Sequence, residues 1–108
     1  MNFKEMASNI GIEEEDFVEL LEMMVEVSMT DIDNFTTELA AGNYSKAAMA
    51  AHSIKGAAGN LGLEGISSTA EELEKAAKRS DKSRMPDNIA LLKQELNLIV
   101  ESLKQARP

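Results

Sequence analysis

Apolar residues recur at spacings of three and four along most of the chain, which is the pattern of one buried face of an α-helix. The first long stretch of this kind covers residues 13–41. Acidic residues fill its first turn, where the positive end of the helix dipole favours them, and Gly42 follows its last turn as a left-handed cap. Thr30 and Asp31 leave open a kink or a break in the middle. The inward positions are Phe17, Leu21, Met24, Ser28, Ile32, Phe35 and Leu39.

The same periodicity predicts three further helices. The second covers residues 44–61, with Asn43 as its N-cap and Gly62 as its stop. The third covers residues 63–79, and a loop over residues 80–83 leads to the fourth, residues 84–105. Pro86 falls in the first turn of the fourth helix, where its missing N–H costs little. The inward positions are Ala47, Ala51, Ile54, Ala58 and Leu61, then Leu63, Ile66, Ala70, Leu73 and Ala77, then Ile89, Leu92, Leu96, Ile99 and Leu103.

Short connections between four amphipathic helices predict an all-α fold, an antiparallel up-down four-helix bundle. A short extra helix over residues 2–9, ended by Gly11, is expected to close one end of the bundle with Phe3, Met6 and Ile10. The chain of 108 residues has the length of one domain, so we expect a single domain over residues 1–108, with the bundle at about residues 13–105.

Composition narrows the chemistry that the chain can carry. There is no cysteine and one histidine, which excludes disulfides, thiolate sites and any site that needs two histidines. No apolar run approaches the ~20 residues that span a membrane, and the chain does not open with a signal peptide, so we expect a cytoplasmic protein with no membrane contact.

The net charge of −8 argues against nucleic-acid binding, because a phosphate backbone selects a basic surface. The charge is also unevenly distributed. Residues 5–45 contain eleven acids and no Lys or Arg, whereas the other residues contain all eleven bases and eight acids. The acidic part is interpreted as a solvated helix face or, alternatively, as an acidic docking surface.

The second predicted helix contains two interior glycines, each of which costs roughly 1 kcal/mol relative to alanine. Gly56 and Gly59 share a stripe with His52 and Lys55, at i, i+3, i+4 and i+7 from the histidine. Helical arithmetic places this stripe roughly 130° from the core direction. We therefore expect His52 to face outward on a surface that Gly56 clears for a partner, with the Lys55 ammonium beside it.

Each of these residues also has an ordinary structural interpretation. A single helical histidine is most often a plain surface residue, Lys55 alone is a solubilising charge, and the glycines could serve helix packing. The four together on one outward stripe favour a functional interpretation. A neutral imidazole is a nucleophile that can accept a phosphoryl group, and an ammonium can stabilise that group in transit. Because no other motif completes a catalytic group around His52, and no phosphate-binding loop is present, the phosphoryl group must come from another protein.

The stretch from Ala50 to Gly62 resembles the signature of histidine-containing phosphotransfer (HPt) domains. The residues that carry the resemblance are His52, Ile54, Lys55, Gly56, Ala58 and Gly62. The run Ala70-Glu71-Glu72-Leu73-Glu74 also resembles the next helix of the family. Ala58 departs from the serine that many members carry, which removes a hydroxyl but leaves the histidine chemistry intact.

The resemblance implies a four-helix phosphocarrier, without an ATP site of its own, in a bacterial-type two-component phosphorelay. His52 would be phosphorylated, through Nε2, Lys55 would assist the phosphoryl group, and Gly56 and Gly59 would keep access clear. Ser45, Ala48 and Met49 would form the docking patch. The partners would be a histidine kinase and the receiver domains of response regulators or hybrid kinases. No cofactor or metal is expected on the chain, because Mg²⁺ belongs to the receiver, and a monomer is expected.

Two other functions remain open on the sequence. One is a helical interaction or adaptor module without chemistry, against which the joint presence of His52, Lys55 and Gly56 argues. The other is the phosphoacceptor domain of a chemotaxis-type histidine kinase, which would need an attached ATP-binding domain.

Overall fold

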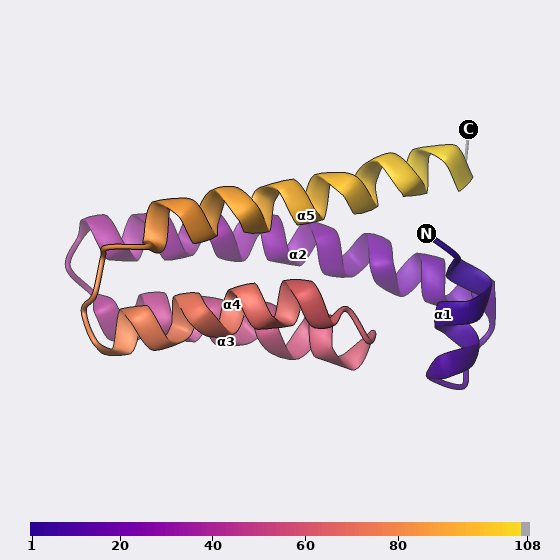
Figure 1. Cartoon of the computed structure of the whole chain (residues 1–108), viewed down its shortest axis with the longest axis horizontal. Helices are drawn as coiled ribbons and strands as arrows, with labels where there is room; N and C mark the ends of the chain where they lie inside the picture. The colour runs from indigo at the N-terminus through magenta and orange to yellow at the C-terminus, as the bar shows by residue number, and fades with distance from the viewer. Residues whose placement is uncertain (107–108) are drawn as a thin grey trace.

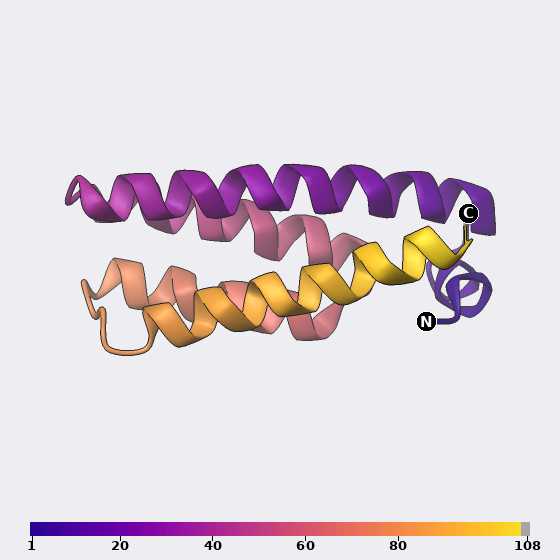
Figure 2. The ribbon, with the colours of Figure 1, turned by 90° about the horizontal axis from the view of Figure 1, so that it is seen from above.

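The computed structural model describes residues 1–106, and five α-helices account for most of them. They are α1 (Phe3–Asn9), α2 (Glu14–Ala40), α3 (Tyr44–Asn60), α4 (Glu64–Lys78) and α5 (Met85–Ala106). No strand occurs in this part of the chain. Helices α2 to α5 run alternately up and down, side by side, as Figures 1 and 2 show from two directions. The predicted antiparallel four-helix bundle is therefore confirmed; the predicted domain includes residues 107 and 108, which lie outside the described residues.

The predicted core stripes are confirmed. Their members in α3 and α4 are buried, together with Leu61 and Leu63 between these helices, and so are the members in α2 and α5 apart from three that are half-buried. Those three, Leu39, Ile89 and Leu103, pack against the core. Burying apolar surface is the dominant stabilising contribution in such a bundle, at about 25 cal/mol per Å².

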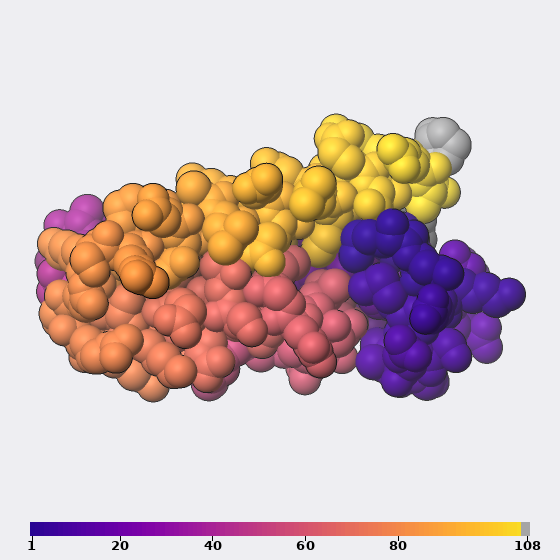
Figure 3. All heavy atoms as spheres, viewed as in Figure 1, coloured from indigo at the N-terminus to yellow at the C-terminus, as the bar shows by residue number. Residues whose placement is uncertain are grey.

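The short helix α1 closes one end of the bundle, as expected. Phe3 is buried, and its ring centroid lies 6.3 Å from that of Phe17 at the start of α2. Met6 and Ile10 pack beside it against the core. The space-filling view shows the N-terminal segment gathered at the same end of the molecule as the last turns of α5 (Figure 3). The Asn2 side chain accepts a hydrogen bond from Glu5 N–H and so caps α1.

The structure settles two local points: the first long helix is continuous, and Asn43 is the N-cap residue of α3, as predicted, but without a side-chain cap. Helix α2 runs unbroken through Thr30 and Asp31, and the Thr30 hydroxyl donates to the Glu26 carbonyl at 3.3 Å within the same helix. Asn43 occupies the N-cap position of α3, but its side chain makes no capping hydrogen bond. The Asn43 amide instead donates to the Glu38 carboxylate at 3.0 Å, which links the end of α2 to the start of α3.

The glycine stops are confirmed at both ends of α3. Gly42 and Gly62 have φ values of 79° and 76°, the left-handed conformation that a side chain disfavours. These tight reversals keep α3 antiparallel to α2 and to α4, so α3 lies between them along its length. None of the described helices is both long and apolar enough to cross a membrane.

Candidate functional site: the His52 face of α3

His52 projects outward from α3, as its place on the helix predicts. Its side chain is 65% exposed, whereas Ala51 and Ile54 beside it are buried in the core. Gly56, one turn later, is exposed, and a Cβ built there would have no heavy atom within 4 Å. The imidazole therefore stands beside a cleared stretch of backbone, which confirms the predicted geometry of His52 and Gly56.

A buried carboxylate from α4 holds the inner side of the imidazole. Nδ1 of His52 lies 3.1 Å from Oε2 of Glu74, and the Glu74 side chain is only 8% exposed. Lys55 Nζ lies 3.1 Å from Oε1 of the same carboxylate, and Lys78 Nζ lies 3.1 Å from its Oε2. One buried Glu thus contacts all three basic side chains, and the charge of Lys55 is paired with Glu74 rather than directed at the imidazole alone.

The cations around Glu74 keep its carboxyl group ionised. Burial by itself would raise the pKa of Glu74, but hydrogen bonds from Lys55 and Lys78, together with their positive charges, outweigh it and lower the pKa below its ordinary value. An ionised carboxylate has no proton to donate, so the hydrogen at the contact with His52 belongs to Nδ1. In the neutral ring the lone pair is then on Nε2, for which the structure gives no partner among residues 1–106.

Glu74 and Lys78 belong to the site although the sequence argument does not single them out. The expectation that no further residue belongs to the site around His52 is wrong, because Glu74 contacts the imidazole. Lys78 lies in the last turn of α4, where the helix dipole favours a cation, and it also contacts Glu74. A signal was present, because Ala70, Glu74 and Lys78 follow one another at i, i+4 and i+8 on one face of α4. The sequence of α4 alone cannot predict that this face contacts His52, which lies 22 residues earlier in the chain.

The backbone under the site is also tied to α4. The Ser67 hydroxyl donates to the main-chain carbonyl of Lys55 at 3.1 Å. Gly59 lies close to the same serine, because a Cβ built at Gly59 would be 3.5 Å from Ser67 Oγ. Gly59 is exposed, as Gly56 is, but unlike Gly56 it borders α4.

The predicted docking residues lie around a shallow hollow beside the imidazole, but not all are accessible. Met49 is 70% exposed and Ser45 is exposed, as expected. Ala48 is only 4% exposed, although it lines the hollow, so its docking role stays a prediction. The His52 hollow is lined by Ser45, Ala48, Met49, His52, Ser53, Glu74 and Lys78.

An apolar groove lies where α3 meets α2, and it is lined by residues of both helices. Leu20, Met23 and Val27 of α2 contribute side chains that are 43%, 61% and 49% exposed. We call this feature the α2 groove; its lining includes Ile12, Leu20, Met23, Val27, Ala57 and Asn60. His52, Gly56 and Asn60 are four residues apart and therefore lie along one face of α3. The exposed backbone at Gly56 thus lies between the imidazole and Asn60, which lines the groove.

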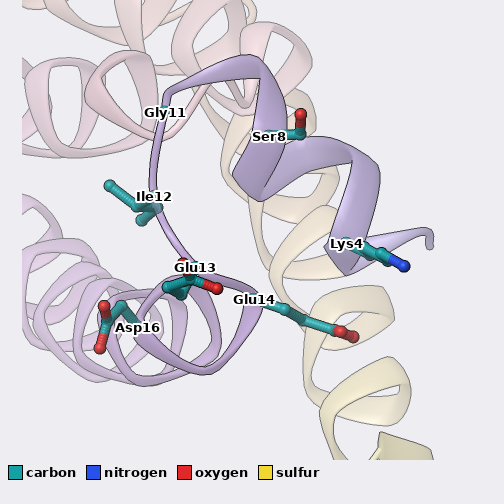
Figure 4. Close-up of a pocket in the computed structure, with 7 residues that line it drawn as sticks. All are labelled: Lys4, Ser8, Gly11, Ile12, Glu13, Glu14 and Asp16. Carbon is teal, nitrogen blue, oxygen red and sulfur yellow. The ribbon is translucent and has the colours of Figure 1, made fainter.

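A further hollow lies between α1 and the first turn of α2, where Figure 4 shows Lys4, Glu13, Glu14 and Asp16 around the loop at Gly11. Within residues 1–106, no group of three or more His, Asp or Glu side chains is placed to hold a metal ion.

An exposed histidine on a helical bundle, oriented by a buried carboxylate and flanked by lysines, is an arrangement that can accept a phosphoryl group. The comparisons agree with this interpretation. The family model described as Hpt domain matches residues 19–106. The crystal structure of histidine-containing phosphotransfer protein B (HptB) from Pseudomonas aeruginosa PAO1 is similar, with a TM-score of 0.81 and 28% sequence identity over 94% of this chain and 89% of that chain. No curated protein matches the chain.

The match over most of the chain shows the family: the chain belongs to the Hpt domain family. It is accordingly a histidine phosphotransfer protein of a phosphorelay.

Proposed function

We propose that His52 is the phosphoryl acceptor and that Nε2 is the attacking atom. The Nε2 lone pair forms a bond to the phosphorus of an aspartyl phosphate on a partner, while the bond from phosphorus to the aspartate oxygen breaks and the carboxylate leaves with its electron pair. The ring keeps its Nδ1 proton and becomes a phosphoimidazolium. The 3.1 Å contact between Nδ1 and the ionised Glu74 carboxylate supports this assignment, because the carboxylate stabilises the positive ring that the reaction creates.

The lysines supply charge for the phosphoryl group. Lys55 and Lys78 both contact Glu74 in this structure, with side chains 31% and 65% exposed. When dianionic phosphate oxygens arrive at Nε2, either ammonium can exchange its contact with Glu74 for one with the phosphoryl group. Glu74 would thus hold the two ammonium groups close to His52 while the histidine is unphosphorylated.

The partners in this proposal are receiver domains and a histidine kinase, the classes with which Hpt domains interact. The chain needs no cofactor of its own, and Mg²⁺ sits on the receiver. A receiver that reaches His52 would also lie over Gly56, where a Cβ would meet no heavy atom within 4 Å, and the α2 groove begins at Ala57 and Asn60 of the same helix. We therefore assign the α2 groove to the apolar part of the receiver surface.

The decisive experiment is labelling from a phosphorylated receiver. Receiver domains charged with radiolabelled acetyl phosphate are mixed with the wild-type chain, with His52→Gln and with Ser53→Ala as a matched exposed control. We expect a label that survives alkali, is lost in acid, persists in Ser53→Ala and is absent from His52→Gln. A label that remains on His52→Gln contradicts the assignment, since a phospholysine would show the same acid and alkali behaviour.

A further inference from the structure

The surface around His52 has the opposite charge character to the chain as a whole. The chain carries a net charge of −8, yet α3 contains no Asp or Glu between Tyr44 and Asn60. The one carboxylate that lines the His52 hollow is Glu74, which is buried and already paired with two lysines. The exposed charges at this hollow are therefore positive.

Cations continue from the hollow onto the end of α4 and the following loop. Lys78 lines the hollow, and Arg79 and Lys82 follow it, all three exposed. Lys82 is held beside the start of α3, because its Nζ lies 5.6 Å from the centre of the Tyr44 ring, next to Ser45 in the lining of the hollow. We call Lys78, Arg79 and Lys82 the basic rim.

Stabilisation of the C-terminal end of α4 explains only some of the cations in the basic rim. Lys75 and Lys78 lie in the last turn of α4, where cations stabilise the negative end of the helix dipole. Lys82 lies beyond the C-cap residue Arg79, outside the reach of that effect. Asp81, the acid within the segment, accepts hydrogen bonds from the backbone N–H and the hydroxyl of Ser83 at 3.0 and 2.7 Å, and it offsets only one of the three charges.

We propose that the basic rim is a steering surface for the acidic face of the phosphoryl-exchanging partner. This inference rests on the proposed function of His52 and adds the chemistry of the partner and its orientation. The acidic face would approach over Lys78 and Lys82, while the eleven acids of residues 5–45 repel it from the α2 side. The apolar part of the partner is thereby directed to the α2 groove, and the phosphorylation pocket to His52.

The test compares two charge reversals that change the net charge equally. Lys82→Glu alters the rim, and Lys104→Glu alters an exposed lysine near the far end of α5, where the lysine pairs with Glu101. The second-order rate constant of transfer from an acidic, acetyl-phosphate-charged receiver is measured between about 0.02 and 0.5 M ionic strength. For the wild-type chain it should fall as salt rises. At low salt Lys82→Glu should be slower by roughly three- to tenfold, and the difference should close at high salt.

Arg79→Glu provides a second rim variant that leaves the Lys82 contact with Tyr44 in place, and it should behave like Lys82→Glu. Equal effects of Lys82→Glu and Lys104→Glu, or a wild-type rate that does not depend on salt, would overturn the steering role. If the transfer rate does not depend on salt but labelling still requires His52, the steering role of the basic rim is rejected and the role of His52 is retained. Labelling that survives His52→Gln while Lys82→Glu and Lys104→Glu still differ rejects His52 and retains the rim.

Discussion

Oε2 of Glu74 lies 3.1 Å from Nδ1 of His52, so a buried acid on α4 orients the exposed histidine of α3. This contact fixes which ring nitrogen carries the proton. We expect the neutral His52 ring to be protonated on Nδ1 in the wild-type chain, and to lose this preference in Glu74→Ala. Long-range proton–nitrogen NMR correlations of the single histidine measure the tautomer directly. The same tautomer in both proteins would mean that Glu74 does not position the ring; Glu72→Ala, an exposed change on the same helix, is the control.

Glu74 also makes stability depend on pH. Its pKa is lowered in the folded chain, since hydrogen bonds and charges from Lys55 and Lys78 exceed the opposing effect of burial. A lowered folded pKa contributes stability above the ordinary value of 4.5, and this contribution is lost as the pH falls through the folded pKa. Urea unfolding of the wild-type chain and Glu74→Gln should therefore differ most near neutral pH and converge in acid. A difference that stays constant from pH 7 to pH 3 would contradict this linkage.

A substitution at Gly56 should change the stability of α3 and the access of a receiver to His52 in opposite directions. A Cβ at this position meets no heavy atom within 4 Å, so Gly56→Leu should fold and gain about 1 kcal/mol of helix propensity. The new side chain would occupy the surface over which a receiver reaches His52, and transfer should fall by at least about tenfold, equivalent to ~1.4 kcal/mol of binding. Thermal unfolding and transfer kinetics are measured together. Gly59→Ala is the control, because its Cβ would contact Ser67 instead of a partner. Unimpaired transfer in Gly56→Leu would show that clearance is not required.

The parts of this site that sequence analysis could predict are those that depend on one helix. The direction of His52, the exposure of Gly56 and the burial of Ala51 and Ile54 all follow from a 3.6-residue period within α3. The glycine stop at Gly62 follows from local backbone preference. These properties need no knowledge of which helix lies opposite.

The details that the pattern of one helix cannot predict are those that a second helix decides. The approach of Ser67, on α4, to Gly59 is one such detail. Judged from its own helix alone, Glu74 would be taken for a solvated surface charge. Its burial is tolerated because Lys55, from α3, and Lys78 pair with the carboxylate and offset the cost of removing it from water. The register of α4 against α3 sets these contacts, and the pattern of either helix alone does not contain it.

Lys55 should affect the rate of transfer more than the fold. Its ammonium contacts Glu74 at 3.1 Å and lies on the same helix as the histidine, one turn away. In Lys55→Ala we expect the bundle to remain helical, because Lys78 still pairs with Glu74, and the single-turnover transfer rate to fall by about ten- to a hundredfold. Circular dichroism and rapid-quench labelling measure the two properties. A rate equal to that of the wild-type chain would show that the Lys55 charge is incidental, and Lys93→Ala on α5 serves as the control for loss of one surface cation.

The α2 groove predicts a binding defect that is separate from the chemistry. Met23 and Val27 are 61% and 49% exposed, so Met23→Asp and Val27→Asp should leave the core intact while placing a charge in the apolar part of the interface. We expect affinity for a receiver to fall roughly tenfold for each change, about 1.4 kcal/mol, with the transfer rate at saturating receiver little altered. Leu98→Asp is the matched control, because Leu98 is 63% exposed on α5, away from the packing of α2 against α3. Isothermal titration with the unphosphorylated receiver measures affinity, and equal losses in Met23→Asp and Leu98→Asp would mean that the groove is not the docking surface. A loss confined to the groove variants would place the receiver across Gly56, with its apolar surface against α2 and its phosphorylation pocket over His52.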